Sequence, residues 1–532
     1  MGVLPPVPAV TLRASEKLMD SRIRGNDKWT YHGAKRIRKH IPVIPANAGI
    51  QVGVLENEFT LNITVQDLLD IPFSHEIGLR DLGIARTFRE ISTDSRTLKH
   101  EDLFIALEGP NFDGHEYLGQ VTKEGALAAI VSDRWFAAHK NRHHTLPILV
   151  VSDPLHAFGT LAGIYRKKFK IPVLVIAGSN GKTTTKELIA HLLSAELDVL
   201  KSEANFNNQV GVPHTLFQLR DGHQAAILEI GTNHPGEIAR LCEIAQPTLA
   251  LITNIGREHL EFFKDLKGVA QEEIAAFDYA FAHDGLAFIN MDDPFLAPAA
   301  ERFGDRAITY GSGTKSDGQA VHAHKSGFAK DGRLELRIQC EGKSFSIRSQ
   351  LIANYTPNLV AAAVAVGIEF QLRRPEIKSQ IESFRPHNKR LEILHLDGIT
   401  VLNDAYNANP DSMESALRTL TEYPVTGRRI AVLGDMFELG ATSQREHRKL
   451  GRKIAEYPLH RVLFTGKDMQ HASRTYHAAA GKTNGAAKNS YFKNKEQLAA
   501  SLRALLRPGD AVLIKGSRGM KMEEVIDLLQ RG

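Results

Sequence analysis

Cysteine is scarce in this sequence, which has only Cys242 and Cys340 among its 532 residues. Two thiols are too few for a disulfide framework or a cysteine-rich metal site, and they favour a reducing compartment. Long apolar runs are missing as well, because no stretch approaches the roughly 20 residues that a membrane helix needs. Hydrophobic residues make up 42% and charged residues 24% of the chain, which excludes a disordered or collagen-like protein. These absences predict a folded protein of several domains without a membrane segment.

Excess charge of one sign is confined to the start of the chain. The net charge is +5, but residues 1–55 hold nine basic and three acidic side chains, so that the other 57 basic and 58 acidic side chains leave residues 56–532 at −1. We interpret residues 1–55 as a basic extension that is disordered or lies upstream of the true start, with a transit peptide as the alternative. The neutral body indicates no nucleic-acid partner, since no binding motif accompanies the charge.

Expected strands and helices alternate through the rest of the chain, which is typical of α/β domains with parallel sheets. Residues 56–154 predict a small N-terminal α/β domain. Residues 155–379 predict a central domain with a doubly wound, mostly parallel sheet and an antiparallel hairpin at 320–350, where apolar side chains alternate. Residues 380–532 predict a Rossmann-like third domain. The strands expected for the last two domains are Val173–Ala177, Ala226–Ile230, Ala250–Thr253, Ala287–Asn290, Ile399–Leu402, Arg429–Leu433, Val462–Phe464 and Ala511–Ile514.

The strongest local signal is a glycine-rich turn between an expected strand and an expected helix, Gly178-Ser-Asn-Gly-Lys-Thr-Thr-Thr185. Backbone N–H groups that converge at a helix N-terminus bind phosphate. The turn therefore predicts an ATP site with Mg²⁺, in which Lys182 reaches the β- and γ-phosphates and Thr183 completes the metal's shell. The loop is shorter than the usual P-loop, because Ile176 stands where its first glycine would fall. The residues expected at the nucleotide are Gly178, Ser179, Asn180, Gly181, Lys182, Thr183 and Thr184.

Two further polar side chains are expected at the same edge of the central sheet. Glu229 lies at the end of an apolar strand, which places its carboxylate beside the glycine-rich turn. A metal-bound acid is a good interpretation there, because a buried structural glutamate without a partner is costly. His259 follows the next strand by one short loop, although a lone loop histidine is more often a surface residue.

The shortened turn resembles that of the ATP-dependent Mur ligases and folylpolyglutamate synthetases, which form amide bonds through an acyl phosphate. From about residue 61 to the end, further segments resemble the same family in the same order. They are Asn205-Phe-Asn-Asn-Gln-Val-Gly-Val-Pro213, Glu229-Ile-Gly-Thr-Asn233, Asn254-Ile-Gly-Arg-Glu-His259, Asn403-Asp-Ala-Tyr-Asn-Ala-Asn-Pro-Asp-Ser-Met413 and Leu433-Gly-Asp-Met-Phe-Glu-Leu-Gly440. The third-domain segments resemble those of members that add D-alanyl-D-alanine to UDP-N-acetylmuramoyl-tripeptide. The resemblance implies these two substrates, ATP and Mg²⁺, and a cytoplasmic, monomeric enzyme of peptidoglycan synthesis without nucleic-acid or membrane partners.

The resemblance also implies roles for single residues. A catalytic set would consist of Lys182, Glu229, His259 and Glu272, and a metal set of Thr183, Glu229 and His259. Around the nucleotide, Asn358 in the Ala-rich helix Pro357–Phe370 would join Arg390 and Asp404 from the third domain. Substrate contacts would come from Ser95 and Arg96 at the diphosphate, Asn207 and Asn208 at the sugar-peptide, and Tyr406, Asn407 and Asn409 at the dipeptide.

The chain departs from the family pattern at two positions. The family usually has a lysine, converted to a carbamate that orients the γ-phosphate, where this chain has Gln271. Our hypothesis is that Glu272 or Glu273 supplies that carboxylate directly, and the alternative is that both are solvated helix residues. Tyr355 occupies the position of the first of two nucleotide-binding asparagines, so adenine recognition is expected to differ in detail.

Three other functions fit parts of this pattern. A sister ligase that adds a diamino acid would carry an Asp-Asn-Pro-Arg segment in its third domain, and the sequence has none. A P-loop ATPase or switch would release phosphate without an amine acceptor. A weak paralogue would follow from the missing lysine. The Asp-Ala-Tyr-Asn-Ala-Asn-Pro segment favours the dipeptide-adding ligase over the sister ligase, and the other two functions stay open.

Overall fold

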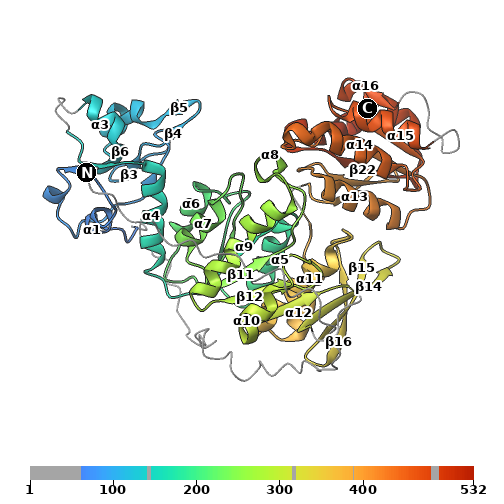
Figure 1. Cartoon of the computed structure of the whole chain (residues 1–532), viewed down its shortest axis with the longest axis horizontal. Helices are drawn as coiled ribbons and strands as arrows, with labels where there is room; N and C mark the ends of the chain where they lie inside the picture. Colours follow the sequence, from blue (N-terminus) through green and yellow to red (C-terminus); the bar gives the residue numbers. More distant parts are fainter. Residues whose placement is uncertain (1–60, 140–144, 314–318, 387–388, 481–489, 532) are drawn as a thin grey trace, which may run out of the picture.

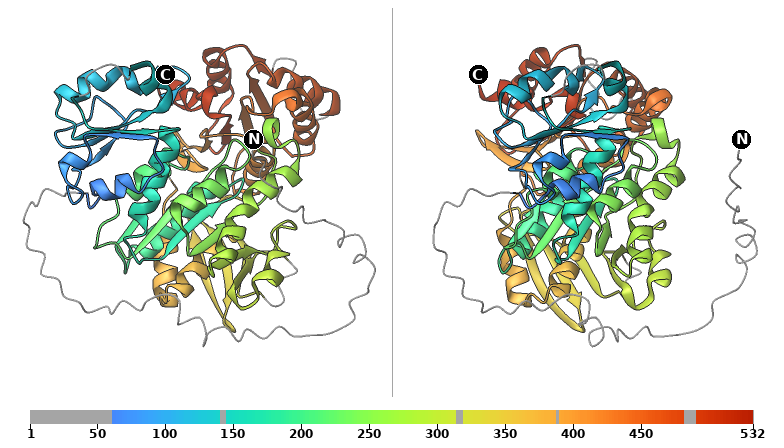
Figure 2. Two further views of the ribbon diagram at one scale, coloured as in Figure 1. Left: turned by 60° about the vertical axis from the view of Figure 1, so that its left-hand side comes forward. Right: turned by 90° about the vertical axis from the view of Figure 1, so that its left-hand side faces the viewer.

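The computed structural model describes residues 61–139, 145–313, 319–386, 389–480 and 490–531, so the basic extension at residues 1–55 lies outside the described residues. Three α/β units follow one another along the chain (Figure 1). Figure 2 shows that the first and third units lie on the same side of the central one. This architecture confirms the predicted fold class. A search of the described part of the chain found no helix long and apolar enough to cross a membrane.

The N-terminal unit is a five-stranded sheet with one antiparallel edge strand. Its order is β1 (His75–Ile77), β7 (Ile148–Val151), β6 (Ala128–Ser132), β3 (Leu103–Ile105) and β2 (Ile91–Ser92), and a separate hairpin pairs β4 (Glu108–Gly109) with β5 (Phe112–Asp113). Its helices are α1 (Val65–Leu69), α2 (Leu118–Lys123) and α3 (Asp133–His139). Thr64 accepts a hydrogen bond from the backbone N–H of Asp67, which caps α1 as its residue type predicts.

The central unit is built on a nine-stranded sheet that changes from parallel to antiparallel at one side. Its order is β16 (Lys343–Ser349), β15 (Leu334–Cys340), β14 (Val321–Phe328), β13 (Ala307–Gly311), β12 (Leu286–Asn290), β11 (Leu249–Ile252), β8 (Val173–Ala177), β10 (Ala225–Glu229) and β9 (Val199–Lys201). Only β14–β15 and β15–β16 pair antiparallel. Every side chain of β8 is buried, as expected for a central parallel strand covered by helices on both faces.

Helices cover both faces of the central sheet. They are α5 (Lys182–Leu193), α6 (Gly211–Leu216), α7 (Glu237–Ala245), α8 (Leu260–Phe263), α9 (Leu266–Ala282), α10 (Ala299–Phe303), α11 (Thr356–Glu369) and α12 (Arg374–Ser383). The Ala-rich α11 packs against α5, β13 and β14, because its small side chains allow a close approach. A further helix, α4 (Pro154–Arg166), contacts α6 and α7 on one side and α1 on the other, and so joins the first two units.

The third unit is a six-stranded sheet with an antiparallel edge. Its order is β17 (Glu392–Leu396), β18 (Ile399–Asp404), β22 (Ala511–Lys515), β19 (Arg429–Leu433), β20 (Arg461–Thr465) and β21 (Tyr491–Phe492). Its helices are α13 (Pro410–Glu422), α14 (Ser443–Ile454), α15 (Met469–Ala480), α16 (Lys495–Leu505) and α17 (Glu523–Gln530). All eight strands expected from the sequence match observed strands to within two residues at each end.

Helix α13 forms much of the contact between the third unit and the central one. At its start, Asp411 and Glu414 pair with Arg257 in the loop after β11. In its last turn, Thr419 Oγ1 accepts a hydrogen bond of 3.0 Å from the backbone N–H of Asn354. At its end, the ring of Tyr423 packs edge-on against Phe328 of β14, with centroids 5.6 Å apart. The helix is therefore held along its whole length.

Candidate active site

A cavity of about 340 Å³ lies where the carboxyl ends of the central strands face the third unit. Its wall includes the N-terminus of α5, which the glycine-rich turn shapes. Gly178 has φ +107°, and a Cβ there would lie 2.4 Å from Thr253 Oγ1, so no larger residue fits. Gly181 has φ +84° and stands at the N-cap of α5. The two glycines of the sequence therefore stand where the backbone of the turn has positive φ.

The turn is fastened to the loop that follows β11. The backbone N–H of Ser179 donates to the carbonyl oxygen of Asn254 at 2.9 Å. Asn254 Nδ2 donates to the carbonyl oxygen of Asn180 at 2.8 Å, and the backbone N–H of Gly256 donates to Ser179 Oγ at 2.8 Å. These reciprocal bonds hold the two loops as one rigid wall of the cavity.

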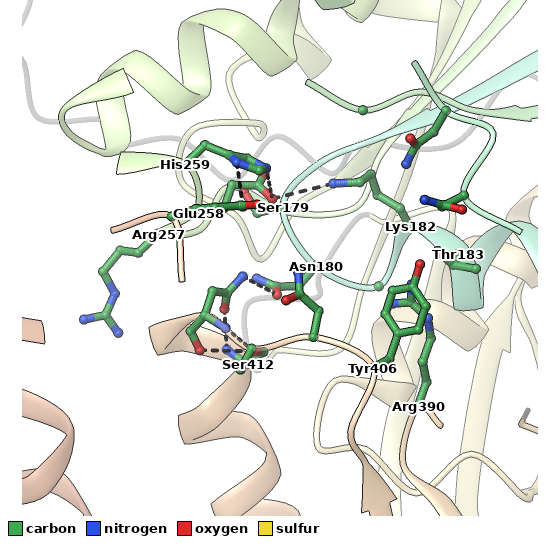
Figure 3. Close-up of a pocket in the computed structure, with 18 of the residues that line it drawn as sticks. Ser179, Asn180, Lys182, Thr183, Arg257, Glu258, His259, Arg390, Tyr406 and Ser412 are labelled. Carbon is green, nitrogen blue, oxygen red and sulfur yellow. Dashed lines mark hydrogen bonds and ion pairs between the residues drawn. The ribbon is translucent and has the colours of Figure 1, made fainter. Parts of the chain in front are cut away.

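Lys182 is the cation of this wall. Its Nζ donates to the carbonyl oxygen of Gly178 and lies 3.6 Å from Glu258 Oε2 (Figure 3). Burial alone would lower the pKa of Lys182, but the carboxylates of Glu258, Glu273 and Glu229 outweigh it and raise that pKa above its ordinary value. The side chain is therefore charged over the whole physiological range and suits a phosphate.

Glu229 ends β10 and His259 follows β11, the two strands that flank β8, and both side chains line the cavity. Glu229 is buried; its Oε1 accepts a hydrogen bond of 2.9 Å from Asn207 Nδ2. Its Oε2 has no hydrogen-bond partner among the described residues and lies 3.9 Å from Lys186 Nζ. His259 Nδ1 lies 3.0 Å from the carboxylate of Glu438 in the third unit, and this hydrogen bond lowers the pKa of Glu438.

The two adjacent glutamates of α9 have different surroundings. The Glu272 carboxylate accepts hydrogen bonds from the backbone N–H groups of Gly236 at 2.7 Å and Ile238 at 2.8 Å. It therefore binds the start of α7 and does not line the cavity. Glu273 is fully buried and accepts 2.7 Å from the N–H of Gly178. Burial raises the pKa of Glu273, although Lys182 opposes that shift. Of the two glutamates in the carboxylate hypothesis, Glu273 is thus the one that contacts the glycine-rich turn, while Gln271 is exposed.

The third unit contributes charged and aromatic groups to the opposite wall. The guanidinium of Arg390 stacks 3.8 Å from the ring centroid of Tyr406 (Figure 3). Asp404 lines the cavity but its Oδ2 is already paired with Lys515 Nζ at 2.6 Å. Lys515 also donates to the carbonyl oxygen of Asn407 at 2.8 Å. The expected residues Arg390, Asp404, Tyr406 and Asn407 thus meet the glycine-rich turn across one cavity.

Two of the expected substrate-binding asparagines also bond backbone N–H groups at helix starts. Asn208 Oδ1 accepts from the backbone N–H of Gly211 at the start of α6, at 2.9 Å. Asn409 Oδ1 accepts from the N–H of Ser412 in α13 at 2.8 Å, and its Nδ2 donates to Asn180 Oδ1 at 2.9 Å. Both line the cavity together with Asn207. Asn409 therefore connects the third unit directly to the glycine-rich turn.

A second cavity of about 210 Å³ lies beside Asn180 and beneath α11. Asn358 lines it, and the buried Oδ1 of Asn358 has no hydrogen-bond partner in the described part of the chain. Asn290 and Asn354 line it as well, although the sequence argument did not single them out. Tyr355, which stands where the family pattern has its first nucleotide-binding asparagine, lines both cavities. The residue before it, Asn354, lines the second cavity and so places an amide group at the same site. Thr184 is buried in α5 and lines neither cavity.

Ser95 and Arg96 are in the N-terminal unit and do not line either of these cavities. Arg96 is exposed and pairs with Asp94, and its hydrogen bonds lower the pKa of Asp94 to about 2. Nearby, Thr93 Oγ1 lies 3.1 Å from His214 Nε2 of α6. This contact places the expected diphosphate segment next to α6, whose first residue donates a hydrogen bond to Asn208.

Arg257 and Glu258 line the main cavity but had no place in the sequence argument. The Arg257 Nε donates to Asp411 Oδ1 at 2.8 Å, and its Nη2 donates to Asp411 Oδ1 at 2.6 Å and to Glu414 Oε1 at 2.8 Å. Both lie inside the segment Asn254–His259, which resembles the family, and this position alone could have suggested from the sequence that they belong to the site.

Comparison with known proteins agrees with this geometry. A family model described as "Mur ligase middle domain" matches residues 176–366, and one described as "Mur ligase, glutamate ligase domain" matches residues 389–518. The chain is 31% identical to the UDP-N-acetylmuramoyl-tripeptide–D-alanyl-D-alanine ligase of Bacillus subtilis, over 83% of this chain and 93% of the relative. It is 32% identical to the enzyme of the same name from Escherichia coli, over 88% and 99%.

Solved structures agree as well. The crystal structure of MurF from Acinetobacter baumannii superposes with a TM-score of 0.73 at 29% identity, over 84% of this chain and 94% of that one. The family models, the relatives and this superposition confirm the resemblance seen in the motifs. The chain belongs to the Mur ligase family.

Proposed function

We propose that this protein is an ATP-dependent ligase that joins D-alanyl-D-alanine to UDP-N-acetylmuramoyl-tripeptide, giving UDP-N-acetylmuramoyl-pentapeptide, ADP and phosphate. One observation carries the proposal. A single cavity combines the glycine-rich turn and Lys182 with Arg390 and Tyr406 from the third unit. Such a cavity can hold a nucleotide and an acyl acceptor together, as the sequence predicts.

The proposed reaction has two steps. The terminal carboxylate of the tripeptide attacks the γ-phosphorus of ATP, the bond from that phosphorus to the β–γ bridging oxygen breaks, and ADP leaves. The amine of the dipeptide then attacks the acyl phosphate, loses a proton and displaces phosphate. Both steps gather negative charge, and Lys182 and the N-terminus of α5 stabilise it because they are fixed in place before reaction.

The residues at the cavity fit Mg²⁺. The buried Oε2 of Glu229 lacks a hydrogen-bond partner among the residues described, and carboxylate oxygens are preferred ligands of this ion. Thr183 at the start of α5 and His259 across the cavity would complete the set. When bound, Mg²⁺ would neutralise charge on the transferred phosphoryl group. Asn207 holds Glu229 Oε1 and so orients its carboxylate.

Closure of the third unit over the nucleotide would exclude water from the acyl phosphate. We assign Arg390 and Asp404 to the nucleotide, Tyr406, Asn407 and Asn409 to the dipeptide, and Asn207 and Asn208 to the sugar-peptide. Ser95 and Arg96 would bind the diphosphate of the UDP group from the N-terminal unit. The location that we propose is the cytoplasm, where these precursors are made.

A phosphate-release assay tests the function. The full chain is incubated with ATP, Mg²⁺ and UDP-N-acetylmuramoyl-tripeptide, with and without D-alanyl-D-alanine. We expect release that depends on the dipeptide, together with a product heavier by the dipeptide less one water. Release that is equal without dipeptide would identify a P-loop ATPase, and release only with a different amino acid would identify a sister ligase.

A further inference from the structure

Three consecutive residues of the loop after β11 face three different partners; Figure 3 shows Arg257 pointing away from Lys182, which Glu258 faces. Arg257 points away from the glycine-rich turn, to Asp411 of α13. His259 faces Glu438 of the third unit. Glu258, between them, faces Lys182 in the cavity. No role has been assigned to Glu258 so far.

The surroundings of Glu258 leave half of its carboxylate unsatisfied. The side chain is 8% exposed, and its Oε2 lies 3.6 Å from Lys182 Nζ and 3.9 Å from His259 Nε2. Its Oε1 is buried without a hydrogen-bond partner in the described ranges. A buried, unpaired carboxylate oxygen is costly, so a residue that serves only the fold would be expected to have a donor there.

The charge around Lys182 shows what kind of ligand is missing. Three carboxylates, those of Glu258, Glu273 and Glu229, act electrostatically on this one ammonium group. Glu229 and Glu258 line the cavity, and each has one buried oxygen without a partner among the described side chains and backbone. A phosphate group repels such oxygens, whereas a cation satisfies them. Carboxylate oxygens together with an imidazole nitrogen are the donors that a divalent cation takes.

We propose that Glu258 is a cation-binding carboxylate of this cavity, whose unpartnered oxygen binds the divalent cation that accompanies ATP. This proposal rests on the proposed function in one respect, namely that the site binds ATP together with a divalent cation. Glu258 also faces Lys182, so binding of the cation at its free oxygen leaves the ammonium group available to phosphate. The other cation that could fill this place is the ammonium group of the acceptor dipeptide, and the experiment separates the two.

The test measures Mn²⁺ binding to the full chain in complex with a non-hydrolysable ATP analogue, by electron paramagnetic resonance and titration calorimetry. We expect Glu258→Gln to weaken Mn²⁺ binding by at least about tenfold. Binding of the analogue in the presence of a chelator should be unchanged or tighter, because the substitution removes a negative charge. Glu258→Asp keeps the carboxylate on a shorter side chain and should recover part of the Mn²⁺ affinity. If Glu258→Gln fails to fold, Glu258→Asp takes its place as the test, with a Mn²⁺ affinity below that of the unaltered chain as the expected result.

Glu261→Gln is the matched control, since Glu261 is an exposed carboxylate three residues further along. It should bind Mn²⁺ like the unaltered chain. The proposal would be overturned if Glu258→Gln binds Mn²⁺ within twofold of the unaltered chain. If the KM for the dipeptide also rises selectively in that variant, the site belongs to the ammonium group of the dipeptide. Dipeptide-dependent phosphate release, measured separately, tests the ligase function. A Glu258-dependent Mn²⁺ site in a chain without that release would refute the ligase and leave this inference standing.

Discussion

Replacement of Arg257 by alanine should loosen the contact between the central and third units. The guanidinium donates three hydrogen bonds of 2.6–2.8 Å to Asp411 and Glu414. A charge-assisted hydrogen bond contributes about 1.5–3 kcal/mol when it is shielded from water. These three side chains are 26–35% exposed, so solvent screening reduces the total to about 1–2 kcal/mol.

Loss of that stabilisation has a measurable consequence at the nucleotide. Arg390 reaches the cavity only as part of the third unit, so the arrangement that binds nucleotide becomes less populated when the contact weakens. A loss of 1–2 kcal/mol corresponds to about 5–30-fold weaker binding. We expect this loss for Arg257→Ala in titration calorimetry with a non-hydrolysable ATP analogue, together with a larger radius of gyration in small-angle X-ray scattering without ligand.

Two control variants make the result interpretable. Arg257→Lys keeps the charge but loses the planar fork, and it should give an intermediate loss. Arg448→Ala removes an exposed arginine of α14 whose side chain bonds Gln444, and it should leave both measurements unchanged. Affinity within twofold of the unaltered chain and an unchanged radius of gyration in Arg257→Ala would refute the reasoning.

Three further outcomes follow from single side chains. Lys182→Met should slow phosphate release by about 10²–10³-fold, and a smaller loss would contradict its role. Lys186→Met should reduce the free energy of unfolding by about 3–5 kcal/mol in urea titrations, because fully buried Lys186 bonds two carbonyl oxygens and lies beside Glu229; an unchanged midpoint would refute this. Burial lowers the pKa of His214 below its usual value of about 6.5, so the unfolded chain binds the proton first and stability should fall as pH drops below 6.5. His214→Gln should have a flatter urea midpoint between pH 7.5 and 5.5, and an equal slope would exclude His214 as the cause.

The architecture was predictable because strands and glycines carry local signals. The apolar strand Val173–Ala177 needs no tertiary information, and Gly178 follows it where the backbone turns with positive φ. Position along parallel strands also predicted that Glu229 and His259 would meet at one cavity, since the carboxyl ends of such strands share one edge.

Pairings between distant segments could not be predicted in the same way. Lys515 ends an apolar strand and carries no local mark; its partner Asp404 is 111 residues away and becomes its neighbour only because β18 and β22 pair. Glu272 and Glu273 are adjacent on a helix, where successive side chains point about 100° apart. Which of them faces the glycine-rich turn depends on how α9 packs, and that is a tertiary property.

The attachment of α13 defines how the third unit can turn. Ion pairs hold its first turn, Thr419 bonds Asn354 in its last turn, and Tyr423 packs on Phe328 just past its end. At 1.5 Å per residue its 13 residues span about 20 Å. Points on a rotation axis move least. A rotation of the third unit about the long axis of α13 would therefore strain these contacts less than a rotation about any other axis. We therefore expect a rotation of the third unit to take place about α13, which would carry Arg390, off this axis, along an arc toward or away from Lys182.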